Sequence, residues 1–136
     1  RHHLSKAADQ RKALMRSLAT ELFLNGEITT TMARAKALKP YAENIITFAK
    51  KGDLAARRQA LKFIFDKETD KYINLETGEV KETLAEGEKL PKQSVLRQLF
   101  VVIGKKYASR NGGYTRIMRL VPRRGDASEM ALIQLV

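Results

Sequence analysis

The sequence contains no cysteine, so neither a disulfide framework nor a cysteine-based zinc site can form. Histidine is almost as scarce, because His2 and His3 are the only two, and no cysteine or cluster of acids lies near them to complete a metal site. No apolar run approaches the roughly 20 residues that a membrane-spanning helix needs. The first residues are basic and unlike an apolar signal sequence, although the chain does not begin with Met, which leaves processing open. We therefore expect a soluble protein with no metal, no cofactor and no membrane segment.

Catalytic residue types are also sparse. An enzyme needs a convergent set of nucleophile, base or metal ligands. Here cysteine is absent, no isolated histidine stands out, and the acids are concentrated in one polar stretch in the middle of the chain. We predict a protein that is not an enzyme and has no small-molecule substrate.

Positive charge is abundant. Lys and Arg number 26 against 15 Asp and Glu, which gives a formal net charge of +11 and an isoelectric point of about 10.1. Such a charge favours a polyanionic partner, either nucleic acid or an anionic membrane. A membrane-binding protein would present a basic amphipathic helix with bulky aromatic residues opposite, whereas the first predicted helix uses its apolar face for the core. Nucleic acid is therefore the favoured partner.

The charge divides the chain into three parts. Residues 1–62 carry a net charge of +8, residues 63–93 carry −3, and residues 94–136 carry +6. The middle part is polar and lacks a sustained apolar period. We interpret residues 67–93 as an acidic insertion, a mobile surface segment or a small hairpin that points away from the polyanion, with an ordinary solvated loop as the plainer alternative.

Apolar periodicity predicts three helices and a strand in the first half. A helix is expected over residues 9–24, ended by Asn25-Gly26, and a short β-branched strand over residues 27–32. A second helix follows over residues 33–51, and Pro40 should kink or restart it. Gly52 and Asp53 suit a helix end and an N-cap, so a third helix should run to about Phe65.

The second half continues with a helix and two strands. Ser94 can cap a helix that runs to about Tyr107, and strands are expected over residues 114–121 and 130–136. Residues 130–136 are apolar on both faces, which suits a central strand. In the preceding strand Arg116 and Arg119 fall on opposite faces, which predicts a bulge or an edge position. The expected fold is a single α+β domain over residues 1–136, ordered α-β-α-α-α-β-β, with helices packed on a small three-stranded mixed sheet.

Several ordered motifs together resemble one family. They are Arg110 to Ile117, Pro122 to Asp126 and Glu129 to Val136 near the end, and Arg1-His2, Gln10 to Arg16 and Ile28 to Lys36 near the start. In this order and spacing the chain resembles bacterial-type large-subunit ribosomal protein seventeen. The resemblance covers nearly everything outside the acidic segment, and the form Asp9-Gln10-Arg11 is similar to cyanobacterial and plastid members.

The resemblance implies a role in the ribosome. It implies a structural, non-catalytic constituent of the large subunit that binds large-subunit rRNA on the solvent side near the polypeptide exit tunnel, beside neighbouring large-subunit proteins. The location would be the bacterial cytoplasm or an organelle. The alternative is a free-standing basic nucleic-acid-binding protein, although the predicted helices lack helix-turn-helix spacing and no RNA-reading motif with interleaved aromatics is present.

We expect two main rRNA contact surfaces, both rich in cations that can pair with phosphates. One is a basic N-terminal arm, residues 1–8, with the start of the first helix: Arg1, His2, His3, Lys6, Arg11, Lys12 and Arg16. The other lies within residues 110–126, where five arginines fall in seventeen residues: Arg110, Asn111, Gly112, Gly113, Arg116, Arg119, Arg123 and Arg124. The weaker candidates are Arg34, Lys36, Lys39, Arg57 and Arg58. All of them have a plainer reading as solvated charges.

Three smaller expectations concern the second surface. The glycines at 112 and 113 should adopt positive φ, and their backbone N–H groups are candidates to meet phosphate. Tyr107 and Tyr114 are expected to pack in the core, with stacking on an unpaired base as the alternative. Asp126 should order its own turn.

Overall fold

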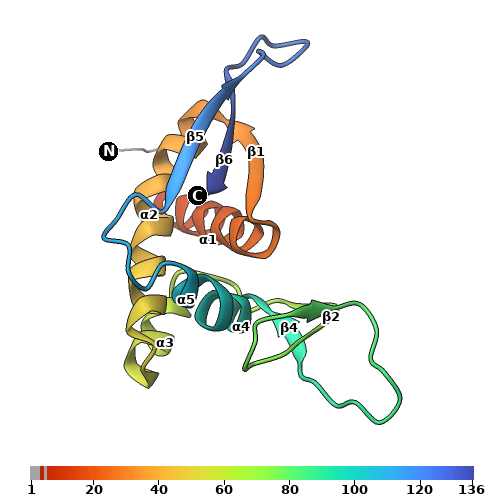
Figure 1. Cartoon of the computed structure of the whole chain (residues 1–136). Coiled ribbons are helices and arrows are strands. Elements are labelled where there is room, and N and C mark those ends of the chain that lie inside the picture. The colour runs from red at the N-terminus through yellow and green to blue at the C-terminus, as the bar shows by residue number, and fades with distance from the viewer. Residues whose placement is uncertain (1–3, 5) are drawn as a thin grey trace.

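The computed structural model describes residue 4 and residues 6–136, which form helices and two three-stranded sheets (Figure 1). The elements in chain order are α1 (Ala8–Asn25), β1 (Glu27–Thr31), α2 (Met32–Lys51), α3 (Leu54–Ala60), β2 (Glu68–Ile73), β3 (Val80–Lys81), β4 (Lys92–Ser94), α4 (Val95–Arg97), the π-helical η1 (Gln98–Ile103), α5 (Gly104–Lys106), β5 (Thr115–Leu120) and β6 (Met130–Leu135). The predicted α+β class and the predicted order of the main helices and strands are confirmed.

The first three helices begin and end largely where their capping residues predict. Gly26 ends α1 with a φ of 81°, and Gly52 ends α2 with a φ of 69°. The Asp53 side chain accepts a hydrogen bond from the Ala56 N–H at 2.7 Å and so caps α3. Helix α2 continues through Pro40 without restarting. Burial of apolar residues on both sides of Pro40, among them Leu38 and Ile45, offsets the lost hydrogen bond and the ring clash of an internal proline.

Helix α3 ends at Ala60, before the predicted end at Phe65. After Ala60 the chain continues in tighter turns, in which the Phe63 N–H donates to the Ala60 carbonyl, and it is held by side chains of α1 and α2. The Phe65 N–H donates to the Thr20 hydroxyl at 3.0 Å, and the Tyr41 hydroxyl donates to the Phe63 carbonyl at 2.7 Å. These contacts join segments far apart in the sequence, so periodicity within the segment could not reveal them.

The larger sheet has the strand order β1-β6-β5, which confirms that the C-terminal strand is central. Both pairings are antiparallel, so the expectation of a mixed sheet was wrong in this respect. Whether neighbouring strands run parallel or antiparallel depends on the path of the chain between them. The composition of a strand does not predict that path. The β5–β6 register runs from Thr115↔Leu135 to Leu120↔Met130 without a shift. The edge position of β5 therefore accommodates Arg116 and Arg119 without a bulge.

The acidic segment forms a second antiparallel sheet with the order β3-β2-β4. Its β2–β3 hairpin agrees with the hairpin interpretation, whereas the third strand, β4, was not predicted. Ile73 of β2 is fully buried, and the Thr69 hydroxyl donates to the Gln93 side chain at 3.0 Å. These contacts give the segment a defined structure, so an ordinary solvated loop is not what the structure shows.

The core lies where the helices meet the larger sheet and one another. Leu22 and Phe23 of α1, Leu38 and Ile46 of α2, and Ile133 of β6 are almost completely buried. The long fourth helix is continuous from α4 through η1 to α5, and the Ser94 hydroxyl caps it by accepting from the Arg97 N–H. Within the described residues, no helix is long and apolar enough to cross a membrane.

The two ends of the molecule differ in charge. Figure 1 shows the turn between β5 and β6 at one end and the β3-β2-β4 sheet at the other. The β5–β6 turn carries Arg123 and Arg124, while residues 68–94, the smaller sheet with its loops (the acidic sheet), carry a net charge of −3. The fold thus separates the arginines of the hairpin from the acidic sheet.

Candidate nucleic-acid interface

The N-terminal surface is only partly visible. Arg1, His2 and His3 lie outside the described residues. Lys12 is exposed on α1, whereas Arg11 is half-buried and its Nη1 donates to the Lys6 carbonyl at 2.8 Å. Arg11 therefore joins the first turn of α1 to the arm, and Lys12 presents its charge to solvent.

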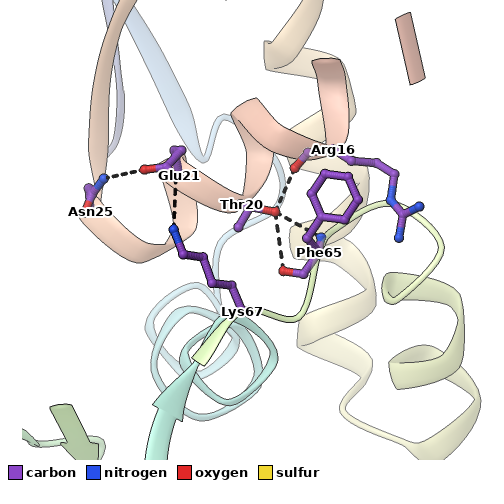
Figure 2. Close-up of polar contacts among 6 residues, drawn as sticks. All are labelled: Arg16, Thr20, Glu21, Asn25, Phe65 and Lys67. Atoms are coloured by element: carbon purple, nitrogen blue, oxygen red, sulfur yellow. Dashed lines mark hydrogen bonds and ion pairs between the residues drawn. The ribbon is translucent and has the colours of Figure 1, made fainter. Parts of the chain in front are cut away.

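Arg16 points into the protein rather than outward (Figure 2). Its Nη2 donates to the Ile64 carbonyl at 3.1 Å, and its guanidinium carbon lies 4.4 Å from the centre of the Phe65 ring. The Thr20 hydroxyl, one turn further along α1, accepts from the Phe65 N–H at 3.0 Å and donates to the Arg16 carbonyl at 2.7 Å. The structure thus gives Arg16 a role in attaching the segment after α3 to α1.

The weaker candidates on α2 and α3 are spread along the molecule. Arg57 and Arg58 are exposed on α3, and the Arg57 guanidinium carbon lies 5.5 Å from the centre of the Phe100 ring. On α2, Lys36 is exposed, while Arg34 and Lys39 are half-buried. Figure 1 shows α3 far from the turn between β5 and β6. The candidate residues therefore do not gather into one patch.

The Gly112-Gly113 turn has the predicted conformation, with φ values of 86° and 65°. Its backbone is directed inward, because the Gly113 N–H donates to a carboxylate oxygen of Glu43 at 3.0 Å. The second carboxylate oxygen accepts from the Thr115 hydroxyl at 3.3 Å. Glu43 is the only acid in α2, and it anchors the turn to that helix. The Gly113 N–H is therefore engaged within the protein and is not free to meet phosphate.

Lys50 supports the same turn from the next part of α2. Its ammonium group donates to the Arg110 carbonyl at 2.6 Å and to the Tyr114 hydroxyl at 2.9 Å. The hydrogen bond from Lys50 lowers the pKa of Tyr114. Neither Lys50 nor Glu43 was predicted to take part in this surface. The one available signal was a lone acid on a helix otherwise rich in apolar and basic residues.

The two tyrosines pack in the core, which confirms the expectation. Tyr107 and Tyr114 are 2% and 4% exposed, with ring centres 5.3 Å apart. Burial raises the pKa of Tyr107, with the charge of Arg110 acting in the opposite direction. The Tyr107 hydroxyl donates to the Val136 carbonyl at 2.6 Å and so ties the end of the chain to the fourth helix.

The turn between β5 and β6 is held by its own ion pair. Arg123 donates through Nε and Nη2 to the two carboxylate oxygens of Asp126, at 3.2 and 2.5 Å. The Ser128 N–H also donates to Asp126, at 3.1 Å, which confirms that Asp126 orders its own turn. The Arg123 guanidinium holds the pKa of the Asp126 carboxyl well below its usual range. Part of the charge of Arg123 is thus neutralised within the turn.

The remaining arginines of the hairpin differ in their surroundings. Arg116 donates to the Gln134 side chain, which in turn donates to Glu27 at 3.0 Å, so a ladder of polar side chains crosses the sheet. Arg119 and Arg124 are exposed, and within the described part of the chain no carboxylate lies within ion-pair distance of either guanidinium group. These two are the hairpin cations best placed to meet an external anion. Residues 4 and 6–136 also contain no cluster of three or more metal-ligating side chains.

Comparison with known proteins decides the family. The sequence model of the family described as ribosomal protein L17 matches residues 14–136. The chain belongs to the ribosomal protein L17 family. Its relatives include the large ribosomal subunit protein bL17 of Limosilactobacillus reuteri strain DSM 20016, 47% identical over 98% of this chain and 95% of that protein. The bL17 proteins of Leuconostoc citreum and Lactiplantibacillus plantarum are 43% and 45% identical over the same shares.

Membership in the L17 family establishes the general class of the protein. The family is a structural, non-enzymatic component of the ribosome, which agrees with the sparse catalytic residues of the sequence. The matched range, residues 14–136, includes both the arginine-bearing hairpin and the segment that forms the smaller sheet.

Proposed function

We propose that this L17-family protein binds folded large-subunit rRNA and stabilises it near the polypeptide exit tunnel, beside neighbouring large-subunit proteins. The family membership supports the ribosomal role, and the resemblance of the sequence motifs supports the exit-tunnel position. The bacterial relatives favour a ribosome of the bacterial type. In this proposal, the groups that bind rRNA phosphates are cationic side chains that form no ion pair within the described part of the protein.

The β5–β6 hairpin is the observation that carries this proposal. Arg119 is exposed on the edge strand β5 and Arg124 is exposed in the turn that follows, and this hairpin is fixed by the Arg123–Asp126 ion pair and the continuous β5–β6 register. Folding of rRNA brings phosphates of distant helices together, and guanidinium groups placed between them offset the repulsion. Because the planar guanidinium binds two phosphate oxygens at once, arginine also fixes their relative position.

The opposite end of the molecule fits a different environment. The acidic sheet would be repelled by phosphates, so we propose that it faces a neighbouring protein or solvent while the hairpin faces rRNA. Leu75 and Val80, both exposed on or beside this sheet, provide apolar area for a protein contact.

The test is the salt dependence of rRNA binding. Replacing both Arg119 and Arg124 with Ala should reduce the slope of log K against log salt by about 2, since each lost phosphate contact removes about 1. The matched control is the double replacement of Lys71 and Lys89 with Ala, which removes the same charge from the acidic segment, where both lysines are exposed. An Arg119/Arg124 variant with the slope of the unmodified protein would refute the phosphate contacts.

A further inference from the structure

A small cavity opens between α2 and the segment that follows α3. Its volume is about 200 Å³, and it is lined by Tyr41, Asn44, Ile45, Thr47, Phe48 and Phe63. Asn44 and Thr47 are exposed, the three aromatic side chains are half-buried, and Ile45 is buried. The cavity thus has an apolar interior and a polar rim. None of its residues belongs to the phosphate-binding hairpin.

The aromatic rings of this cavity are fixed before any ligand arrives. The Tyr41 and Phe63 rings are nearly perpendicular, at 87° with centres 5.8 Å apart. The Phe48 ring lies nearly parallel to that of Phe63, at 9° with centres 6.2 Å apart. Burial raises the pKa of Tyr41 to about 12, so its hydroxyl stays protonated and keeps its bond to the Phe63 carbonyl. A cavity that is already ordered loses little conformational entropy when a flat group enters.

Basic residues share the cavity's face of α2 or flank its lining residues in sequence. At 100° per residue, Arg34 and Lys51 fall on the same face of α2 as Tyr41 and Phe48, and Lys51 is exposed one turn beyond Thr47. The only acid in α2, Glu43, faces away and binds the Gly113 turn. Lys62, next to Phe63, is also exposed. This combination of aromatic rings and nearby cations suits a ligand in which a flat apolar group is attached to an anion.

We propose that the cavity receives one unpaired base of the RNA, stacked on the aromatic side chains, with Asn44 and Thr47 bonding its polar edge and Lys51 near the adjoining phosphate. The inference rests on the proposed RNA-binding function and deepens it. Unpaired bases of folded RNA stack on aromatic side chains, whereas bases inside a duplex are already stacked on one another. The volume suits a single ring system, because pockets for drug-sized ligands begin at roughly 300 Å³.

The test compares two RNA probes with the full chain. Phe48→Leu keeps an apolar side chain but removes the ring, and it should weaken binding to large-subunit rRNA at least about fivefold, the low end for the loss of one base–aromatic stack. Binding to a fully paired RNA duplex should stay unchanged. The matched control is Phe65→Leu, which makes the same replacement at an exposed phenylalanine that lies outside the cavity, under the Arg16 guanidinium. Ultraviolet cross-linking of the unmodified protein to rRNA should attach a nucleotide to the peptide that contains Phe48 or Phe63.

A second variant distinguishes loss of the base site from misfolding of Phe48→Leu. Asn44→Asp changes an exposed rim residue and places a negative charge beside the proposed base and phosphate, so it should weaken rRNA binding without altering the circular dichroism spectrum. Equal loss of affinity for rRNA and duplex, or no loss in either variant, would overturn the base site. So would protection of Phe48 in assembled particles without any cross-link to rRNA, because a neighbouring protein would then occupy the cavity. Absence of rRNA binding by the unmodified protein would instead refute the proposed function.

Discussion

Arg16 and Arg124 carry the same guanidinium group in different surroundings. Arg16 is half-buried, donates to the carbonyl of Ile64 and lies over the Phe65 ring (Figure 2). Arg124 is exposed at the turn between β5 and β6. The Nη2 of the first arginine bonds the segment after α3 and so helps to attach it to α1, although the buried Nε of the same group has no hydrogen-bond partner. The second retains donors for an external anion.

Replacing Arg16 with Ala should therefore affect folding more than RNA binding. Loss of its hydrogen bonds leaves the Ile64 carbonyl without this donor, and we expect the free energy of unfolding to fall by about 1.5–3 kcal/mol, the range for hydrogen bonds to charged groups. Urea denaturation measures this change. The control is Lys12→Ala on the exposed side of α1, which should stay within about 0.5 kcal/mol of the unmodified protein. Equal stability of the two variants would contradict the structural role of Arg16.

The sequence indicated the chemical character of these residues but not their partners. Arginine-rich segments and the turn at Asp126 were recognisable because their signals are local: residue type, spacing and glycine. Glu43 and Gly113 are separated by 70 positions, so their hydrogen bond depends on the packing of α2 against the start of β5. Sequence periodicity contains no information about such a pair until the fold is known.

At the level of elements, the packing of α5 on α2 depends on one glycine. A Cβ built on Gly104 would lie 2.6 Å from the Ala49 carbonyl oxygen, a backbone atom that cannot rotate away. Gly104 itself is buried, and its helical conformation requires no positive φ. Gly104 is therefore needed because it lets the two helices approach closely, and not because its backbone adopts a conformation that other residues avoid.

Gly104→Ala should force the two helices apart. We expect a loss of about 1–3 kcal/mol in the free energy of unfolding, the usual cost of overpacking a well-filled interior. Chemical denaturation of this variant can be compared with Lys105→Ala, the exposed neighbour in the same helix. If Gly104→Ala is as stable as Lys105→Ala, the close contact with Ala49 does not exist in solution.

The C-terminal strand is a second element on which the fold depends. Strand β6 lies between β1 and β5, and the Val136 N–H donates to the Tyr114 carbonyl at 3.0 Å. Deleting residues 134–136 should remove these pairings together with the Tyr107 bond and abolish a cooperative thermal transition. Val136→Ala keeps the backbone groups and should retain that transition. A truncated chain that melts cooperatively near the unmodified protein would show that the end of β6 is dispensable.

The sequence predicted best those helices and strands in which apolar residues recur at regular intervals or in an unbroken run. The helices α1 and α2 and the apolar strand β6 were predicted within a few residues, because their packing surfaces follow the 3.6-residue period or an uninterrupted apolar run. Strand β4 was missed because it has only three residues and pairs with a distant strand. The direction of strand pairing and the end of α3 likewise arise from tertiary contacts.

For the molecule as a whole, the central feature is the separation of charge along the fold. The arginine-bearing hairpin lies at one end and the acidic sheet at the other (Figure 1). A net charge of +11 steers the chain toward any polyanion, but this separation also gives it an orientation. A protein that binds with one end toward rRNA leaves the other for a neighbouring protein or solvent. Charge composition alone predicted a polyanionic partner. The positions of the hairpin and the acidic sheet are the basis for the proposed orientation on rRNA.

Sedimentation of this chain, expressed in a bacterial cell, tests the ribosomal role most directly. On a low-salt sucrose gradient, the protein should move with large-subunit particles, and ribonuclease treatment that dissolves those particles should release it to the top. Raising the salt should release it progressively, because phosphate contacts weaken with ionic strength. A protein that stays free of large-subunit particles at low salt, or that follows DNA or a small RNA, would contradict the ribosomal role and favour a free-standing nucleic-acid-binding protein.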